Sequence, residues 1–147
     1  MQLQREGNPA LNTVTAYGNN YVEINRVRYE YAIFFQPEGD ILKWELSSPE
    51  QITSAELKQL AGLNTASANP LDFLDNVAEQ APEGAPEVIL IGTGTKQQFL
   101  PIETTRPLLS AGIGIEIMTT PAAARTYNIL MSEGRRVMAA LLPHQEY

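Results

Sequence analysis

The 147-residue chain contains no cysteine and a single histidine. The absence of cysteine excludes disulfides, thiolate metal sites, iron–sulfur ligation and catalysis by a thiol. The histidine, His144, lies between Pro143 and Gln145 near the last residue of the sequence, and we expect it to be solvated. It speaks against a Ser-His-Asp triad, and one histidine excludes every metal motif that needs two.

Positive charge is also scarce, with 10 basic against 17 acidic residues and a formal net charge of −7. The nearest approach to a basic cluster is Arg125, Arg135 and Arg136. Nucleic acid repels an acidic protein that has no basic patch, so we expect no nucleic-acid binding.

Long apolar runs are missing as well. The longest, 32–35 and 137–142, are far shorter than the roughly 20 residues that a membrane-spanning helix needs. Residues 1–12 resemble neither a signal peptide nor a transit peptide. We therefore expect no membrane span and a bacterial protein of the cytoplasm, folded as a single domain over 1–147 with its core at about 12–143.

The first third of the chain has the composition of β-strands. Residues 13–17, 21–24, 27–35 and 41–46 are rich in β-branched and aromatic side chains. Turn signals at Asn19-Asn20, Asn25 and Gly39 separate them. This pattern predicts an antiparallel meander of four or five short strands.

The middle of the chain changes to helical spacing. Thr53 and Glu56 match a capping box ahead of a helix that Gly62 ends. A second short helix is expected at 70–77, and the composition of 81–86 predicts a loop.

The last third of the chain alternates between strand-like and helical spacing of its apolar residues. We expect strands at 88–91, 114–118 and 135–142, and helices at 104–112 and from Thr119 to about Glu133. Pro121 suits the first helical position, because the N–H that it lacks has no partner there. Strand–helix–strand units connect by right-handed crossovers, which predicts an α/β fold with parallel C-terminal strands.

Two polar segments follow strands of this predicted sheet, namely Gly92–Thr95 and Thr119–Thr120. Because ligands favour the carboxyl edge of parallel strands, and helix N-termini there offer free N–H groups, an anion is a candidate ligand. Lys96 is a further candidate for supplying a positive charge to it. The candidate ligand-binding residues are Gly92, Thr93, Gly94, Thr95, Thr119, Thr120, Arg125 and Asn128.

A structural interpretation of the same residues is favoured. Gln97 stands where a dinucleotide-binding fingerprint has its third glycine, and no Gly-Lys-Ser/Thr run makes a P-loop. Two glycines around Thr93 suit a sharp strand exit, and Thr119 suits a helix cap. Asn128 is a poor helix-interior residue, so either a local hydrogen bond or a functional role accounts for it.

Carboxylate pairs give no clear catalytic or metal site. Glu38 with Asp40, and Asp72 with Asp75, are local pairs of a kind common on surfaces. Asp72 and Asp75 share one side of the helix expected at 70–77, where a magnesium ion is conceivable. We predict no catalytic residue, no metal site and no cofactor, and we leave enzymatic activity open while favouring its absence.

A longer pattern resembles one known family. It consists of Ile-Gly-Thr-Gly at 91–94, Phe-Leu-Pro at 99–101, Gly-Ile-Glu-Ile-Met-Thr-Thr at 114–120, and the stretch 123–137 that contains Thr-Tyr-Asn and Glu-Gly-Arg-Arg. The chain is similar over about 12–143 to the Mth-type domain family of unknown function. Eukaryotic relatives in this family include the mitochondrial complex I assembly factor three and an adipogenesis-associated protein.

The resemblance implies a three-layer α/β domain with a central mixed, mostly parallel sheet and an N-terminal β-hairpin layer. It implies no established activity and no cofactor, and for one branch a role as an assembly partner. The positions that recur in the family are Gly92, Thr93, Gly94, Thr119, Tyr127, Asn128, Glu133 and Arg135.

Two functions follow as hypotheses. The favoured one is a non-catalytic, assembly-factor-like module that docks on an unidentified protein partner through the helix and its neighbours at 119–136. The alternative is a small anion- or nucleotide-binding domain or an enzyme that uses the cleft between Gly92–Thr95 and Thr119–Thr120. A homodimer is a further option.

Overall fold

The computed structural model describes residues 11–63 and 84–143. The helix expected at 70–77, the Asp72–Asp75 pair, the first half of the loop at 81–86 and His144 lie outside the described residues. The described strands are β1 (Val14–Gly18), β2 (Tyr21–Ile24), β3 (Val27–Tyr29), β4 (Ile33–Phe35), β5 (Leu42–Lys43), β6 (Val88–Gly92), β7 (Gly114–Met118) and β8 (Val137–Leu141). The described helices are α1 (Ser54–Ala61), α3 (Ile102–Ser110), α4 (Thr120–Ser132) and a short 3-10 turn at Pro49–Gln51.

Five strands form a central mixed sheet in the order β5-β4-β8-β6-β7. β6 pairs in parallel with β7 and β8, while β4 pairs antiparallel with β8 and β5. The parallel pairs follow from the two crossovers through α3 and α4, which are the units predicted from the last third of the chain. β1, β2 and β3 form a separate antiparallel sheet.

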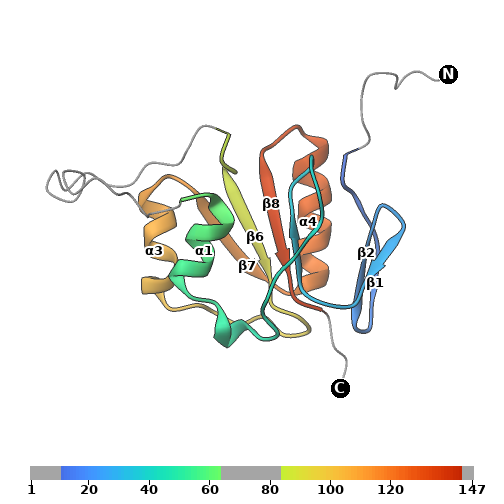
Figure 1. Ribbon diagram of the computed structural model, residues 1–147, viewed down its shortest axis with the longest axis horizontal. Coiled ribbons are helices and arrows are strands. Elements are labelled where there is room, and N and C mark those ends of the chain that lie inside the picture. The colour runs from blue at the N-terminus through green and yellow to red at the C-terminus, as the bar shows by residue number, and fades with distance from the viewer. Residues whose placement is uncertain (1–10, 64–83, 144–147) are drawn as a thin grey trace, which may run out of the picture.

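Three layers result, as Figure 1 shows. α1 and α3 lie side by side on one face of the central sheet, and their core contains Leu57, Leu108, Ile89 and Ile91. The other face is covered by α4 together with the small sheet, around a second apolar core. The fold class predicted from the sequence and from the family resemblance is confirmed.

β8 shows why the sheet is covered on both faces. Val137, Ala139 and Leu141 belong to the core beneath α4, whereas the alternate residues Met138 and Ala140 belong to the core beneath α1 and α3. This is the alternation expected from the sequence, because successive strand residues point to opposite faces.

The predicted meander of four or five strands is wrong in its second half. The run at 27–35 is not one strand, because β3 ends at Tyr29 and β4 begins at Ile33 in the other sheet. Ile33 pairs with Leu141 of β8 across a long stretch of sequence. No glycine, proline or asparagine marks this change of sheet, so the strand-like composition runs through it without a signal.

Several predicted boundaries also shift. α3 begins at Ile102 rather than Thr104, after Pro101, and Pro121 occupies the second helical position rather than the first. The strand expected at 41–46 is reduced to Leu42–Lys43. Thr53 caps α1 by accepting a hydrogen bond from the Glu56 N–H, which is the first half of the predicted capping box. Gly62 ends the helix as predicted, with a positive φ of 77°.

Candidate functional site

The turn after β6 and the start of α4 meet at the carboxyl edge of the central sheet. The Thr93 N–H donates to the Met118 carbonyl at 2.8 Å, and the Thr120 N–H donates to the Gly94 carbonyl at 2.9 Å. The Gly94 N–H donates in turn to the Thr120 hydroxyl at 2.8 Å. The topology thus brings the glycine corner and the two threonines together, as the strand–helix alternation predicts.

Most polar groups at this junction bind one another. The Thr120 hydroxyl, which is fully buried, donates to the Leu142 carbonyl at 2.6 Å. The Thr93 hydroxyl donates to the Lys96 carbonyl at 2.7 Å. The Thr119 hydroxyl accepts from the Ala122 N–H and caps α4. These three hydroxyls therefore hold the corner in shape.

Gly92 is required here by the close approach of α4. A Cβ atom at Gly92 would lie 2.9 Å from the Thr120 Cα atom and 3.0 Å from a methyl group of Leu141. Backbone at that distance cannot move aside without shifting the helix. The first glycine of the corner thus serves helix–sheet packing.

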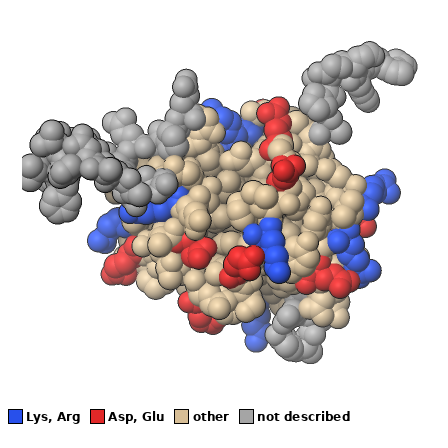
Figure 2. All heavy atoms as spheres, in the orientation of Figure 1, with Lys and Arg blue, Asp and Glu red and all other residues tan. Residues whose placement is uncertain are grey.

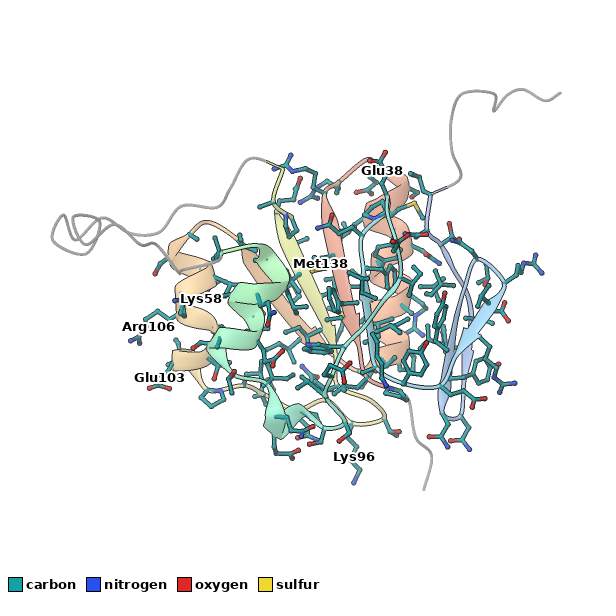
Figure 3. The ribbon with its side chains drawn as sticks, viewed as in Figure 1. Glu38, Lys58, Lys96, Glu103, Arg106 and Met138 are labelled. Atoms are coloured by element: carbon teal, nitrogen blue, oxygen red, sulfur yellow. The ribbon has the colours of Figure 1, made fainter. Side chains whose placement is uncertain are left out.

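A cavity of about 450 Å³ lies beside the corner. Its lining residues are Glu30, Tyr31, Ala32, Leu46, Ser47, Ser48, Pro49, Glu50, Thr93, Gly94, Thr95, Lys96, Gln98, Leu142 and Pro143. The Thr95 hydroxyl is buried and has no hydrogen-bond partner in the part of the chain that the structure describes. Lys96 is exposed and points outward (Figure 3), while Glu30 and Glu50 bring negative charge to the same walls.

Arg125 and Asn128 lie elsewhere, where α4 meets the small sheet. The Arg125 guanidinium donates to the Tyr17 hydroxyl at 2.8 Å. The Asn128 side chain accepts from the Val14 N–H at 3.0 Å and donates to the Val14 carbonyl at 2.9 Å. Neither residue lines the cavity. A ligand role for the predicted set stays a prediction, and the set does not form one continuous surface.

Asn12 joins distant segments of the chain through hydrogen bonds, a role that was not predicted from the sequence. It is 7% exposed, and its amide donates to the Gln36 and Gly39 carbonyls at 2.7 and 2.9 Å. Its own carbonyl accepts the Tyr127 hydroxyl at 2.7 Å, and burial raises the pKa of that phenol. The one indication in the sequence is Tyr127, because the hydroxyl of a buried tyrosine needs a hydrogen-bond partner.

An ion-pair cluster lies at the opposite edge of the sheet. The Arg135 Nε atom is 2.6 Å from the Glu87 carboxylate, and the Arg136 N–H donates to the same group at 3.3 Å. These two contacts hold the pKa of Glu87 below its ordinary value. Arg135 and Arg136 also line a cavity of about 430 Å³ with Met131 and Val137.

The face seen in Figure 2 carries charge of both signs, and its acidic and basic groups are scattered without a large patch of one sign. The residues that the structure describes contain no group of three or more metal-ligating side chains. In the same residues we find no helix whose length and apolar character would let it span a membrane.

Large apolar side chains are exposed along α3. Phe99 is 83% exposed, Ile102 59% and Leu109 51%. Ile102 and Leu109 are seven residues apart, which places them on the same side of the helix. Phe99 precedes the helix by one turn's spacing. We call Phe99, Ile102 and Leu109 the α3 flank.

A protein-family model described as "Protein of unknown function (DUF498/DUF598)" matches residues 14–142. The chain belongs to this family. Among solved structures it is similar to a Bordetella pertussis protein described as a Mth938-like domain, with 52% identity and a TM-score of 0.76. That match covers 99% of this chain and 94% of the other. The resemblance drawn from the sequence is thereby confirmed.

Two curated relatives match over shorter stretches. The zebrafish (Danio rerio) NADH dehydrogenase [ubiquinone] 1 alpha subcomplex assembly factor 3 is 42% identical over 57 residues, which are 39% of this chain and 33% of that protein. A 13 kDa major membrane protein of Francisella tularensis is 40% identical over 57 residues, 39% of this chain and 46% of that protein. Each match spans less than half of the relative's length.

Proposed function

We propose that this protein is a non-catalytic protein-binding module that acts as an assembly factor does, by docking on another protein. Relatedness to the zebrafish assembly factor supports the proposal. The single structural observation that carries it is the α3 flank, three large apolar side chains that are exposed on α3 or just before it. Such groups on a folded protein commonly mark a contact surface.

The α3 flank is a better docking surface than α4, which the sequence favoured. One side of α4 packs on the central sheet, and another binds the small sheet through Arg125 and Asn128. Its large exposed apolar residue is Ile129, at 57%. α3 instead carries two such residues, Ile102 and Leu109, on one side, and Phe99 shortly precedes it.

The test is affinity capture with the tagged full chain, followed by mass spectrometry. Ile102→Ser and Ile129→Ser form a matched pair, because the two isoleucines are 59% and 57% exposed on different helices. We expect a stoichiometric partner that binds the wild type and Ile129→Ser alike. Ile102→Ser should weaken binding about tenfold or more, since full burial of an isoleucine is worth about 1.5–3 kcal/mol.

Two results would contradict this proposal. The absence of any reproducible stoichiometric partner would remove the protein-binding function. Loss of the partner in Ile129→Ser alone would move the docking surface to α4. If a subunit of NADH dehydrogenase were among the captured proteins, this chain and the zebrafish assembly factor would share a kind of partner as well as sequence similarity.

A second candidate is the binding of a small anion or nucleotide in the cavity at the carboxyl edge. The observation that favours it is the buried Thr95 hydroxyl, which has no hydrogen-bond partner among residues 11–63 and 84–143. A thermal-shift screen of phosphates and nucleotides tests it, because a ligand at about 100 times its Kd adds roughly 2.7 kcal/mol. Thr95→Val should abolish any shift, whereas Thr95→Ser should keep it. An unchanged shift in Thr95→Val would remove this site.

We also propose a cytoplasmic location. The absence of cysteine, and hence of disulfides, supports a reducing compartment. Because one relative is named a membrane protein, fractionation of cells that express the native protein is the direct test. Recovery in the membrane fraction that survives a high-salt wash would contradict the proposal.

A further inference from the structure

We propose that the open edge of β7 is a strand-addition site for an extended, basic segment of a partner protein. This inference rests on the protein-binding function proposed above. It adds the place of docking, the conformation of the bound segment and its charge.

The backbone of β7 has hydrogen-bonding groups that β6 does not use. β7 is the edge strand of the central sheet, and β6 is the one strand in that sheet's order beside it. The Gly114 N–H donates to the Glu87 carbonyl at 2.9 Å, and the Met118 carbonyl accepts from Thr93 at 2.8 Å. Alternate residues of a parallel strand use one neighbour, so the backbone groups of Ile115 and Ile117 point away from β6.

Part of this outward row is already covered. The Gln97 amide donates to the Ile117 carbonyl at 3.1 Å. Among the residues that the structure describes, the N–H and carbonyl of Ile115 and the N–H of Ile117 have no partner. An added strand would satisfy these groups, as it does wherever a peptide extends the edge of a sheet.

Apolar side chains are also available near this edge. α3 contacts β7 on one face of the sheet, with α1 packed against it (Figure 1). Ile102 and Leu109 are exposed and, being seven residues apart, lie on the same side of this helix. This helix, which contacts the edge strand, therefore carries apolar groups that a bound segment could cover.

Charge selects the chemistry of the segment. Glu116 lies at the centre of β7 and is exposed, while Ile115 and Ile117 on the other face pack against the core beneath α1 and α3. A lysine or arginine opposite Glu116 would pair favourably with it. The net charge of −7 adds a general preference for a basic partner.

The same carboxylate disfavours a second copy of this chain at the edge. Antiparallel pairing of two β7 strands about their centres would set Glu116 against its own equivalent, and like charges opposite one another destabilise a sheet. A charge on an edge strand is a known way to prevent self-association. It leaves the edge available to a segment of opposite charge.

The experiment uses the full chain, labelled with ¹⁵N, and two synthetic peptides. One alternates lysine with valine, and its twin has glutamate in place of lysine. Amide hydrogen exchange is followed residue by residue. At about ten times its Kd, the lysine peptide should slow exchange at Ile115 and Ile117 about tenfold, because bound chain is protected. The glutamate peptide should leave both rates unchanged.

Three variants make the test specific to this edge. Glu116→Lys should exchange the preference between the two peptides. Ile115→Pro removes an outward N–H without removing a hydrogen bond to β6, so it should abolish binding. Ile115→Val keeps the N–H and should bind as the wild type does, which controls for the loss of side-chain packing.

Several outcomes would overturn the inference. They are equal protection by both peptides, protection of Ile115 and Ile117 in the chain alone, and a dimer in sedimentation that Glu116→Lys abolishes. No protection by either peptide would also overturn it. If a captured partner still binds Glu116→Lys and Ile115→Pro, the β7 site is refuted and the protein-binding function stands.

Discussion

Asn128 of α4 binds Val14 of β1 through both backbone groups of that residue, accepting from its N–H at 3.0 Å and donating to its carbonyl at 2.9 Å. The amide thereby supplies the two hydrogen bonds that a neighbouring strand would supply. A helix and the first strand of a separate sheet are joined in this way across 114 positions of sequence.

Asn128→Ala should therefore destabilise the fold. The substitution leaves two partly buried backbone groups without partners, which costs about 1–3 kcal/mol even though alanine is the better helix former. Urea unfolding measures the loss. Gln59→Ala is the control, since Gln59 is an exposed amide within α1, and it should change the free energy of unfolding by less than about 0.5 kcal/mol. Equal effects of the two substitutions would show that the Asn128–Val14 contact is not a stabilising one.

Thr120 gives a second stability test at the glycine corner. Its buried hydroxyl joins the Gly94 N–H to the Leu142 carbonyl. Thr120→Val keeps the shape of the side chain and leaves both groups unsatisfied, so we expect a loss of about 2–4 kcal/mol in urea unfolding. Thr120→Ser keeps the hydroxyl and should lose only about 1 kcal/mol from the missing methyl group. Similar losses in both variants would mean that the methyl group, not the hydroxyl, stabilises the corner.

The meeting of Gly94 with Thr120 could be predicted from the sequence, because right-handed crossovers bring successive strand ends to one edge. The spacing of β6, α4 and β8 is local information, and it was sufficient for most of the parallel half of the fold. The pairing of Ile33 with Leu141 was not accessible in the same way. It depends on a contact between distant segments, and the strand-like run at 27–35 contains no residue that signals the change of sheet.

The candidate site was likewise predictable from the sequence only in part. Thr93, Thr119 and Thr120 could be placed together from the topology. Arg125 and Asn128 were assigned to the same site, yet they face the small sheet. Their direction depends on which side of α4 that sheet occupies, and helical spacing alone does not contain this information. Asn12 was missed for the same reason, because all of its partners are distant in sequence.

Two strand glycines allow a matched test of close packing. Gly92→Ala places a methyl group 2.9 Å from the Thr120 Cα atom, whereas Gly114→Ala places one no closer than 3.6 Å to its nearest neighbours. We expect Gly92→Ala to destabilise the protein by about 1–3 kcal/mol, the usual cost of overpacking. Gly114→Ala should be neutral or stabilising by about 0.5 kcal/mol, since alanine loses less conformational entropy in a strand. Chemical denaturation of both variants measures the two changes in the free energy of unfolding. Equal stabilities would refute the close approach of α4 to β6.

The Glu87 cluster predicts a pH dependence. The Arg135 side chain and the Arg136 N–H lower the pKa of Glu87 in the folded state, while in the unfolded chain it titrates near its ordinary value of 4.5. The stabilising effect of the ionised carboxylate is thus complete above about pH 4.5 and is lost as the pH falls through the lowered folded-state pKa. Glu87→Gln should remove this contribution, so the gap in stability between wild type and variant should narrow as the pH falls below 4.5.

The measurement is urea unfolding of both proteins across the acid range, with Glu45→Gln as the control. Glu45 is exposed, lies outside the helices and has no ion pair among the described residues, so it controls for the loss of a surface carboxylate. High salt should shrink the difference due to Glu87, because the pair with Arg135 is partly exposed and therefore screened. A gap between wild type and Glu87→Gln that stays constant with pH would mean that Arg135 and Arg136 do not stabilise the ionised carboxylate.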